Sequence, residues 1–334
     1  MPPSSSASAP GPGRAAGPAA VWRPDAVLGA GYERTDLILG EDAEGELLAV
    51  LVHRAGRPPR GRPVLVLHGW SDYVFQRDLL EHLAARGLDA WALDLRKHGR
   101  SLLPGQTPTA VSSLEDYDAE LGAALALIAD SAPAGSGPPL LLAHSTGGLV
   151  AALWAMRRPD TVAGLVLNSP WLAFHLGDVA RRAVLPLVRG LARRRPAARI
   201  LPRGTDHYAR TTHRERGGAF EYDLALKPPG GHPFPASTMA AVLEGQGRLA
   251  AGEVGVPVLV LRSDRSRLRP RFDESMRRAD VVLDVRAMDA AARRLGPDVE
   301  IAVIEGAVHD VFLSEPEPRA AAAAALDDWL AHRM

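Results

Sequence analysis

The chain has 334 residues, of which 46% are hydrophobic and 23% charged, a balance typical of a soluble globular protein. Lysine plus arginine equals aspartate plus glutamate, at 39 each, so no net charge attracts nucleic acid and no such partner is expected. The chain has no cysteine, which excludes disulfides, thiolate nucleophiles and metal sites with cysteine ligands. Its apolar runs are too short to span a bilayer, so no transmembrane helix is expected.

The chain begins with a segment of unusual composition. Residues 2–20 are almost all proline, glycine, serine and alanine, which cannot bury enough apolar surface to fold. We therefore predict a disordered tail over residues 1–24. The segment also lacks the apolar stretch of a secretory signal, which favours a cytoplasmic location.

After the tail, strand-like and helix-like patterns alternate. Two short apolar stretches, 37–39 and 47–52, predict a leading hairpin with Gly40 and Gly45 in its turn region. Further strands are predicted at 64–67, 88–93, 140–143, 163–167, 256–261 and 299–304. Helices are predicted at 75–86, 114–129, 149–157, 239–250, 285–294 and 318–332. The alternation predicts an α/β fold, with a mostly parallel central sheet covered by helices on both faces.

The alternation stops over residues 172–238, which are rich in arginine and proline. We interpret this segment as a helical cap, inserted between two parts of the core, 25–171 and 239–334, and lying over the carboxyl edge of the sheet. Its apolar residues at helical spacing are Val179, Ala183, Val184, Leu187, Val188, Leu191 and Ala192. Arginines surround them, so one interpretation is an amphipathic element that touches an anionic lipid surface. The alternative is a stripe that packs on the core beneath solvated arginines, and Pro186, which would kink a single helix, favours it.

A strand, a sharp turn and a helix are predicted to meet at Ser145. The apolar run 140–142 leads through Ala143 and His144 to this serine, and two glycines at 147–148 open the helix. The pattern is typical of the nucleophile elbow of α/β-hydrolases, G-x-S-x-G, which exposes a serine above the sheet. Ala143 replaces the first glycine, and alanine is the mildest change at a position that must be small. We predict Ser145 as the nucleophile.

A serine nucleophile needs a base that accepts its proton and a carboxylate that orients the base. In α/β-hydrolases these follow along the chain in the order serine, acid, histidine. His309 comes directly after the last predicted strand and is the best base among eleven histidines.

Two aspartates compete for the role of the acid. Asp264 follows the predicted strand 256–261, where such acids normally sit. Asp280 lies 29 residues before His309, a separation that fits one helix and one strand, whereas from Asp264 it is 45 residues and leaves a segment unexplained. We prefer Asp280, with Asp264 as the main alternative and Asp284 as a third.

The tetrahedral intermediate needs two N–H donors for its oxyanion. One is predicted to be the backbone N–H of Thr146, directly after the nucleophile. The other is that of Trp70, because Gly69 lets the backbone turn close to the substrate. We interpret His68 as structural, with its ring bonded to nearby backbone, because no other residue stands at a metal-ligand spacing from it.

These features together resemble the monoglyceride lipase, lysophospholipase and serine aminopeptidase branch of the α/β-hydrolases, from about residue 64 to the C-terminus. The matching motifs are His68-Gly69, the elbow at 143–147, the acid fragment 280–284, the histidine fragment 305–309, and a turn at 94–101. This turn is similar to the D-x-R-G-H-G-x-S turn of that branch, with Lys97 where glycine is usual.

The resemblance implies a serine hydrolase that cleaves carboxylic esters, such as monoacylglycerols or lysophospholipids, through an acyl-enzyme and without cofactor or metal. Its partner would be a small acyl ester, with Trp171, Phe174 and Phe220 as pocket walls or, alternatively, as plain core. An aminopeptidase, a thioesterase or an acyltransferase could use the same triad, and a non-catalytic scaffold is a further alternative. An aminopeptidase needs a carboxylate cluster in the cap, and the available acids, Glu215, Glu221 and Asp223, are scattered. A scaffold usually lacks a triad member, and none is missing.

Overall fold

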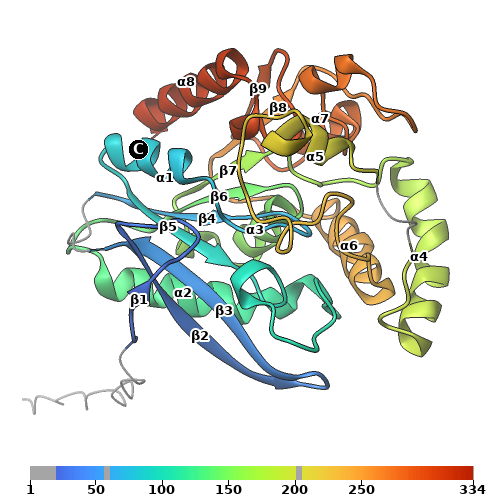
Figure 1. Ribbon diagram of the computed structural model, residues 1–334, viewed down its shortest axis with the longest axis horizontal. Helices are drawn as coiled ribbons and strands as arrows, with labels where there is room; N and C mark the ends of the chain where they lie inside the picture. The colour runs from blue at the N-terminus through green and yellow to red at the C-terminus, as the bar shows by residue number, and fades with distance from the viewer. Residues whose placement is uncertain (1–19, 56–60, 201–204, 334) are drawn as a thin grey trace, which may run out of the picture.

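The computed structural model of the protein describes residues 20–55, 61–200 and 205–333, so most of the predicted tail lies outside the described residues. Within them, nine strands form one sheet with helices on both sides (Figure 1). The strands are β1 (Arg23–Pro24), β2 (Tyr32–Asp42), β3 (Gly45–Arg54), β4 (Pro63–Leu67), β5 (Asp89–Asp94), β6 (Leu140–His144), β7 (Gly164–Asn168), β8 (Val258–Ser263) and β9 (Val299–Ile304). The α-helices are α1 (Arg77–Ala85), α2 (Asp118–Ser131), α3 (Thr146–Arg157), α4 (Gly177–Arg194), α5 (His207–Thr212), α6 (Ala236–Leu249), α7 (Val285–Ala292) and α8 (Pro316–Arg333). The predicted fold class is confirmed.

The order of the strands creates a crevice at one edge of the sheet. The order is β1-β2-β3-β5-β4-β6-β7-β8-β9, antiparallel from β1 to β5 and parallel from β5 to β9. The chain runs from β4 outward to β5 and then returns to β6, on the other side of β4. Ligands bind where the strand order reverses in this way, beyond the carboxyl ends of the strands. In this chain that place lies beyond the ends of β4 and β6.

Two hydrophobic cores cover the two faces of the sheet. Leu140 and Leu142 of β6 pack in the core that includes α1 and α8, whereas Leu141 and Ala143 pack in the core that includes α2 and α3. Figure 1 shows α1 and α8 above the sheet and α2 below it. Because a central parallel strand is buried on both faces, its sequence is continuously apolar rather than alternating.

Most predicted elements are present, with boundaries shifted by a few residues. The leading hairpin is longer than predicted and extends over the whole of β2 and β3. The predicted helix 114–129 is a 3₁₀ turn, Leu114–Tyr117, followed by α2. No helix among the described residues has the length and apolar character needed to cross a membrane.

The predicted tail is too long at its C-terminal end. Arg23 and Pro24 pair with Arg34 and Glu33 as the short strand β1. The guanidinium of Arg23 also lies 2.5 Å from the carboxylate of Asp36. These contacts order residues that composition alone assigns to the tail.

The turn after β5 contains a lysine in a left-handed backbone conformation. Lys97 has a φ of 57°, which explains why glycine is usual at this position. Its buried Nζ lies 2.6 Å from Oδ2 of Asp42 and 2.5 Å from Oε2 of Glu44. These ion pairs fix the tip of the β2–β3 hairpin to the turn.

Between β7 and β8 the chain forms α4, α5 and α6. Helix α4 packs on α6 at the right of Figure 1. It runs as one helix, Gly177–Arg194, with Pro186 inside it. Pro186 and Arg182, one turn earlier, are both exposed, so water can satisfy the carbonyl group that the proline leaves without a donor.

The apolar residues of α4 divide between two faces. Val184, Val188 and Ala192 pack against the core. Val179 and Leu187 face outward and are 84% and 75% exposed. The interpretation that the apolar stripe packs on the core is therefore correct for the inner face of α4 only.

Candidate active site

Ser145 forms the turn between β6 and α3. Its φ of 52° and ψ of −116° lie outside the regions that a residue with a side chain normally adopts. Neighbouring backbone stabilises this conformation. The N–H of Ser145 donates to the carbonyl of Asn168 at 3.0 Å, and the carbonyl of Ser145 accepts from the N–H of Trp171 at 3.0 Å. The sequence prediction of a sharp turn at this serine is thus reproduced by the backbone geometry.

Glycines allow the loop after β4 to approach the serine. A Cβ atom on Gly147 would lie 2.2 Å from the carbonyl oxygen of His68, and one on Gly69 would lie 2.9 Å from Cβ of Ser145. The loop that carries Trp70 therefore lies directly against the turn at Ser145. Thr146 is the first residue of α3, so its N–H has no acceptor within the helix. Both predicted oxyanion donors belong to backbone beside the serine.

A continuous chain of hydrogen bonds joins Ser145, His309 and Asp280. The Nε2 atom of His309 lies 3.0 Å from Oγ of Ser145, and its Nδ1 atom lies 2.8 Å from Oδ2 of Asp280. All three residues are buried. Such a chain can hold the imidazole with its proton on Nδ1, which leaves Nε2 free to accept the proton of the serine.

Asp280, and not Asp264, contacts His309. The Oδ1 atom of Asp280 accepts the N–H groups of Val282 and Leu283 at 2.7 and 2.8 Å, which fixes the carboxylate. Asp264 instead accepts the N–H of Gly306 at 2.9 Å and a hydrogen bond from its neighbour Arg265.

Asp284, the third candidate acid, and His68, the histidine after β4, contact other groups and not His309. Asp284 caps the first turn of α7 by accepting the N–H of Arg286 at 2.9 Å. His68 bonds to the backbone with both ring nitrogens, at 2.7 Å to the carbonyl of Gly69 and at 3.0 Å to the N–H of Leu95. This is the structural role that the sequence predicted. No group of three or more potential metal ligands occurs among the described residues.

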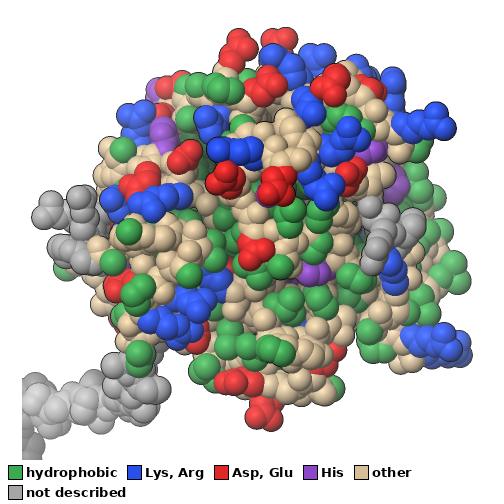
Figure 2. Space-filling model, in the orientation of Figure 1, with side chains coloured by type: hydrophobic (Ala, Val, Ile, Leu, Met, Phe, Trp, Pro, Cys, Tyr) green, Lys and Arg blue, Asp and Glu red, His purple; other side chains and the backbone are tan. Residues whose placement is uncertain are grey.

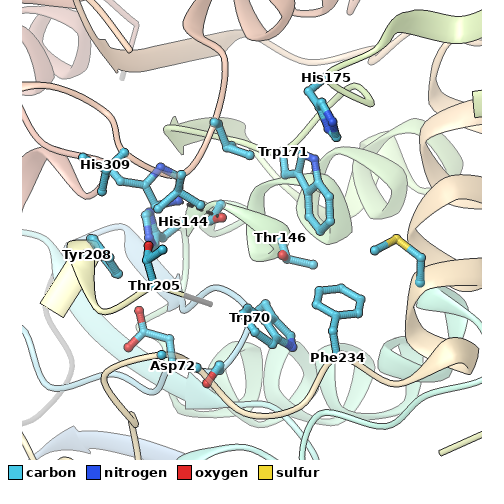
Figure 3. Close-up of a pocket in the computed structure, with 18 of the residues that line it drawn as sticks. Trp70, Asp72, His144, Thr146, Trp171, His175, Thr205, Tyr208, Phe234 and His309 are labelled. Carbon is cyan, nitrogen blue, oxygen red and sulfur yellow. Dashed lines mark hydrogen bonds between the residues drawn. The ribbon is translucent and has the colours of Figure 1, made fainter. Parts of the chain in front are cut away.

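Ser145 and His309 line a cavity of about 570 Å³ (Figure 3). Most of its wall is apolar and comes from the segments after β7 and from α4 and α6. The apolar residues include Trp171, Phe174, Val184, Val188, Ile200, Phe234, Met239 and Leu243. A smaller polar part contains Asp72, Tyr208, Tyr222 and Lys227. The hydrogen-bonded serine thus faces a cavity suited to an apolar chain.

Two of the three predicted wall residues line this cavity. Trp171 and Phe174 do so, but Phe220 does not, so that prediction is wrong. The ring of Phe220 instead lies under the guanidinium group of Arg319, 5.2 Å from the ring centre. Position within the segment 172–238 was its only sequence signal, and this does not determine which way a ring points.

Comparison with known proteins agrees with this geometry. The family model described as serine aminopeptidase, S33 matches residues 58–317. The chain belongs to this α/β-hydrolase family. It is 26% identical over 265 residues to a monoacylglycerol lipase of Mycolicibacterium smegmatis, covering 78% of this chain and 85% of the relative.

Solved structures of other α/β-hydrolases share the fold. The chain superposes on a monoacylglycerol lipase of Paleococcus ferrophilus with a TM-score of 0.62 and 20% identity, covering 90% of this chain and 99% of that one. A monoglyceride lipase of Saccharomyces cerevisiae gives a TM-score of 0.61 and 15% identity, over 90% and 97% of the two chains. The predicted branch of the α/β-hydrolases is confirmed by the family match.

This α/β-hydrolase has an extensive buried network behind the serine, which the sequence prediction missed. Nδ1 of His144 lies 3.1 Å from the carbonyl oxygen of Asn168, and since a carbonyl only accepts, Nδ1 carries the proton and donates it. Burial lowers the pKa of His144 to about 4. The carboxylate of Asp310 accepts from the side chains of Asn168 at 2.6 Å and Gln76 at 3.0 Å. Only the position of His144 next to the nucleophile could have signalled the network.

The acidic residues of the cavity do not form a cluster in this hydrolase. Asp72 is the carboxylate in the described cavity wall, and it is paired with Lys227 at 2.8 Å. Glu221 is exposed and pairs with Arg214, and neither Glu215 nor Asp223 lines the cavity. The described wall therefore offers no unpaired carboxylate for a substrate ammonium group.

Proposed function

We propose that the protein hydrolyses carboxylic esters of the monoacylglycerol or lysophospholipid type through an acyl-enzyme. Ser145 would be the nucleophile, His309 the general base and Asp280 the acid that orients it. The observation that carries the proposal is the hydrogen-bonded chain of these three residues, which opens into an apolar cavity. The name of the relative from Mycolicibacterium smegmatis supports the choice of substrate class.

The proposed reaction has two steps. Oγ of Ser145 attacks the acyl carbonyl while Nε2 of His309 takes its proton, and the N–H groups of Trp70 and Thr146 bind the developing oxyanion. His309 then gives the proton to the leaving alcohol. In the second step water attacks the acyl-enzyme with His309 again as the base, and the fatty acid is released from Ser145. Asp280 stabilises the imidazolium that forms in each step.

The shape and chemistry of the cavity support an acyl chain as its occupant. Its apolar wall continues from Ser145 to the inner face of α4, at Val184 and Val188. Burial of each methylene group in such a wall contributes about 0.8 kcal/mol. The absence of an unpaired acid in the described wall favours this function over an aminopeptidase. A thioesterase or an acyltransferase would use the same groups. A thioester substrate in the assay detects the first activity, and an added alcohol acceptor detects the second.

The assay that tests the proposal is hydrolysis of p-nitrophenyl esters from acetate to palmitate, with monoacylglycerol, lysophosphatidylcholine and an amino-acid p-nitroanilide in parallel. We expect turnover of the esters and none of the anilide. Ser145→Ala should reduce kcat by at least about 10³-fold. Unchanged ester turnover in Ser145→Ala would contradict the proposal.

We also propose that residues 172–238 form the cap and that α4 contacts anionic lipid with its outer face. Figure 2 shows hydrophobic side chains along α4 at the right edge, with basic side chains at its lower end. The exposed apolar residues are Leu176, directly before α4, and Val179, Leu187 and Leu191 on the helix. Arg182 and Arg193 on α4 are also exposed. Apolar side chains flanked by arginines suit the interface of a membrane with acidic head groups.

Sedimentation with vesicles tests this contact. We expect binding to phosphatidylcholine vesicles that contain phosphatidylglycerol, weaker binding without it, and a decrease with salt. Val179→Ser/Leu187→Ser should weaken binding and leave turnover of soluble esters unchanged. Arg286→Ser, at an exposed site on α7, is the matched control. Equal binding by all variants would contradict the contact.

The cytoplasmic location stays a prediction from the sequence.

A further inference from the structure

A buried ion pair joins the loop that carries Trp70 to a distant part of the chain. The Nζ atom of Lys227 lies 2.8 Å from Oδ2 of Asp72, and the two side chains are only 5% and 3% exposed. Asp72 is two residues after Trp70 in the loop 69–73, and Lys227 is in the segment 222–232, between α5 and α6. Figure 3 shows Asp72 and Trp70 on one loop at the same side of the cavity.

Lys227 lies in a cage of three aromatic rings. Its Nζ atom is 5.0 Å from the ring centre of Phe75, 4.8 Å from that of Tyr208 and 5.1 Å from that of Tyr222. Each distance is within the range of cation–π attraction. Since the amine has Asp72 on one side and three aromatic rings around it, its position is fixed.

Further contacts join the same two segments. The N–H of His232 donates to Oγ of Ser71 at 2.8 Å, and the N–H of Asp223 donates to the hydroxyl of Tyr73 at 2.7 Å. Gly231 packs against the indole of Trp70, where a Cβ atom would lie 2.6 Å from the ring. Ser71 has a φ of 53°, an uncommon conformation that needs support from its surroundings. The segment 222–232 therefore contacts the loop 69–73 at three consecutive residues after Trp70, namely Ser71, Asp72 and Tyr73.

The choice of lysine is unusual for this chain. Lys97 and Lys227 are the only lysines among its 39 basic residues. A compact ammonium group fits between three rings and a carboxylate, whereas the planar guanidinium of arginine is larger and requires a different arrangement of partners. Because a buried ion pair adds little net stability compared with apolar residues of the same volume, stability does not explain why it is present.

We propose that the Lys227–Asp72 pair positions the loop 69–73, so that the N–H of Trp70 is fixed where the oxyanion of the tetrahedral intermediate forms. Lys227 is then a positioning residue, which acts on the reaction through Asp72 and Trp70 without touching the reacting atoms. This inference rests on the proposed function, because it assumes that Trp70 donates to the oxyanion. Misplacement of a donor by about 1 Å can reduce the rate about 10²-fold.

The test compares Lys227→Met, Asp72→Asn and the double variant Lys227→Met/Asp72→Asn on a soluble short-chain ester. The single variants leave one buried charge without its partner and are expected to unfold more easily. The double variant removes both charges, and its new side-chain amide keeps an oxygen to accept the N–H of Tyr73, which Asp72 accepts at 2.9 Å. We expect its kcat to fall about 10- to 100-fold, with KM within about 3-fold of the wild type.

A transition-state analogue distinguishes a displaced oxyanion donor from a nonspecific loss of structure. A trifluoromethyl ketone forms a hemiketal with Ser145 whose oxyanion occupies the place of the intermediate, so its inhibition constant should rise in parallel with the loss of kcat. Binding of the corresponding alcohol, which has no oxyanion, should not change. Lys97→Met is the matched control, because it removes the other buried lysine, whose partners Asp42 and Glu44 lie in the β2–β3 hairpin. It should keep wild-type kcat and inhibition.

Lys227→Arg keeps a positive charge beside Asp72, so it is the variant to compare if the double variant does not fold. We expect an intermediate loss of kcat, about 3- to 10-fold, with the same shift in analogue inhibition. Wild-type kcat in the double variant or, failing its folding, in Lys227→Arg would overturn the proposal, as would an effect confined to KM. Ser145→Ala, assayed alongside, reports on the proposed function itself. If that variant stays active, the proposed function fails whatever Lys227 does.

Discussion

Oδ2 of Asp280 lies 2.8 Å from Nδ1 of His309, although sixteen residues separate this aspartate from the one that directly follows β8. The intervening chain leaves the end of β8 and returns to it. The N–H of Asp280 donates to the carbonyl of Arg265 at 2.9 Å, and the N–H of Arg267 donates to the carbonyl of Asp280 at 2.8 Å. The carboxylate thus occupies the usual place of the acid beside β8, reached by a longer path.

The first prediction concerns this carboxylate. Asp280→Asn should reduce kcat about 10³- to 10⁴-fold on a p-nitrophenyl ester, because an amide cannot hold the histidine with its proton on Nδ1. The two backbone N–H groups that contact Oδ1 can still be accepted, so the fold should persist. Steady-state kinetics and a thermal melt measure both properties.

Asp264→Asn is the matched control for Asp280→Asn. Its carboxylate accepts the N–H of Gly306 and contacts Arg265 but not His309. We expect kcat to stay within about 5-fold of the wild type. If Asp264→Asn lost activity and Asp280→Asn kept it, the assignment of the acid would be wrong.

The second prediction concerns the close packing around Ser145. In Gly147→Ala the new methyl group would lie 2.2 Å from the carbonyl oxygen of His68, so the loop with Trp70 or the start of α3 must move. We expect at least about a 10²-fold loss of kcat or a large loss of stability. Ala143→Gly, which restores the usual G-x-S-x-G, should leave kcat nearly unchanged. Comparable activity in both variants would show that the packing is not critical.

The third prediction uses two neighbouring residues on opposite faces of α4. Val188 is 7% exposed and lines the cavity, whereas Leu187 is 75% exposed. Val188→Trp should fill part of the acyl site and lower kcat/KM for laurate and palmitate esters at least about 10-fold, with little effect on acetate. Leu187→Trp, assayed without vesicles, should leave the whole chain-length profile unchanged. A profile that shifted equally in both variants would place the acyl chain elsewhere.

Much of this arrangement could be predicted from the sequence, because its signals are local. Apolar runs predicted β4 and β6. The elbow motif identified Ser145, and the position directly after the last predicted strand identified His309. The choice between Asp264 and Asp280 could only be argued from spacing. It depends on the backbone bridge between Ser266 and Asp280, a contact that no local pattern reveals.

Other features depend on contacts between distant segments. Nothing around Lys227 in the sequence points to Asp72, which is 155 residues away. The face of α4 that each apolar residue occupies depends on how the helix packs on α6. Such relationships are set by tertiary packing, which propensity and periodicity do not encode.

The last prediction concerns the stability of the protein at acidic pH. Burial lowers the pKa of His144 to about 4, against an ordinary value of 6.5, so the unfolded chain binds a proton here more readily than the folded one. The stabilisation from a neutral His144 is therefore complete above pH 6.5 and is lost as the pH falls toward 4. The loss amounts to at most about 3 kcal/mol. Burial also lowers the pKa of His98, which acts in the same direction.

Urea unfolding at intervals between about pH 7.5 and 4 measures this effect. The free energy of unfolding should decrease with falling pH in the wild type and decrease less in His144→Asn, whose side-chain amide can still donate to the carbonyl of Asn168. The pKa of Asp310 is also lowered: burial opposes this, but the neighbouring His144 and the hydrogen bond from Asn168 outweigh it. Its contribution is lost only below its ordinary pKa of 3.8, outside this interval. Equal slopes for the wild type and His144→Asn would mean that His144 is not the group that takes up the proton.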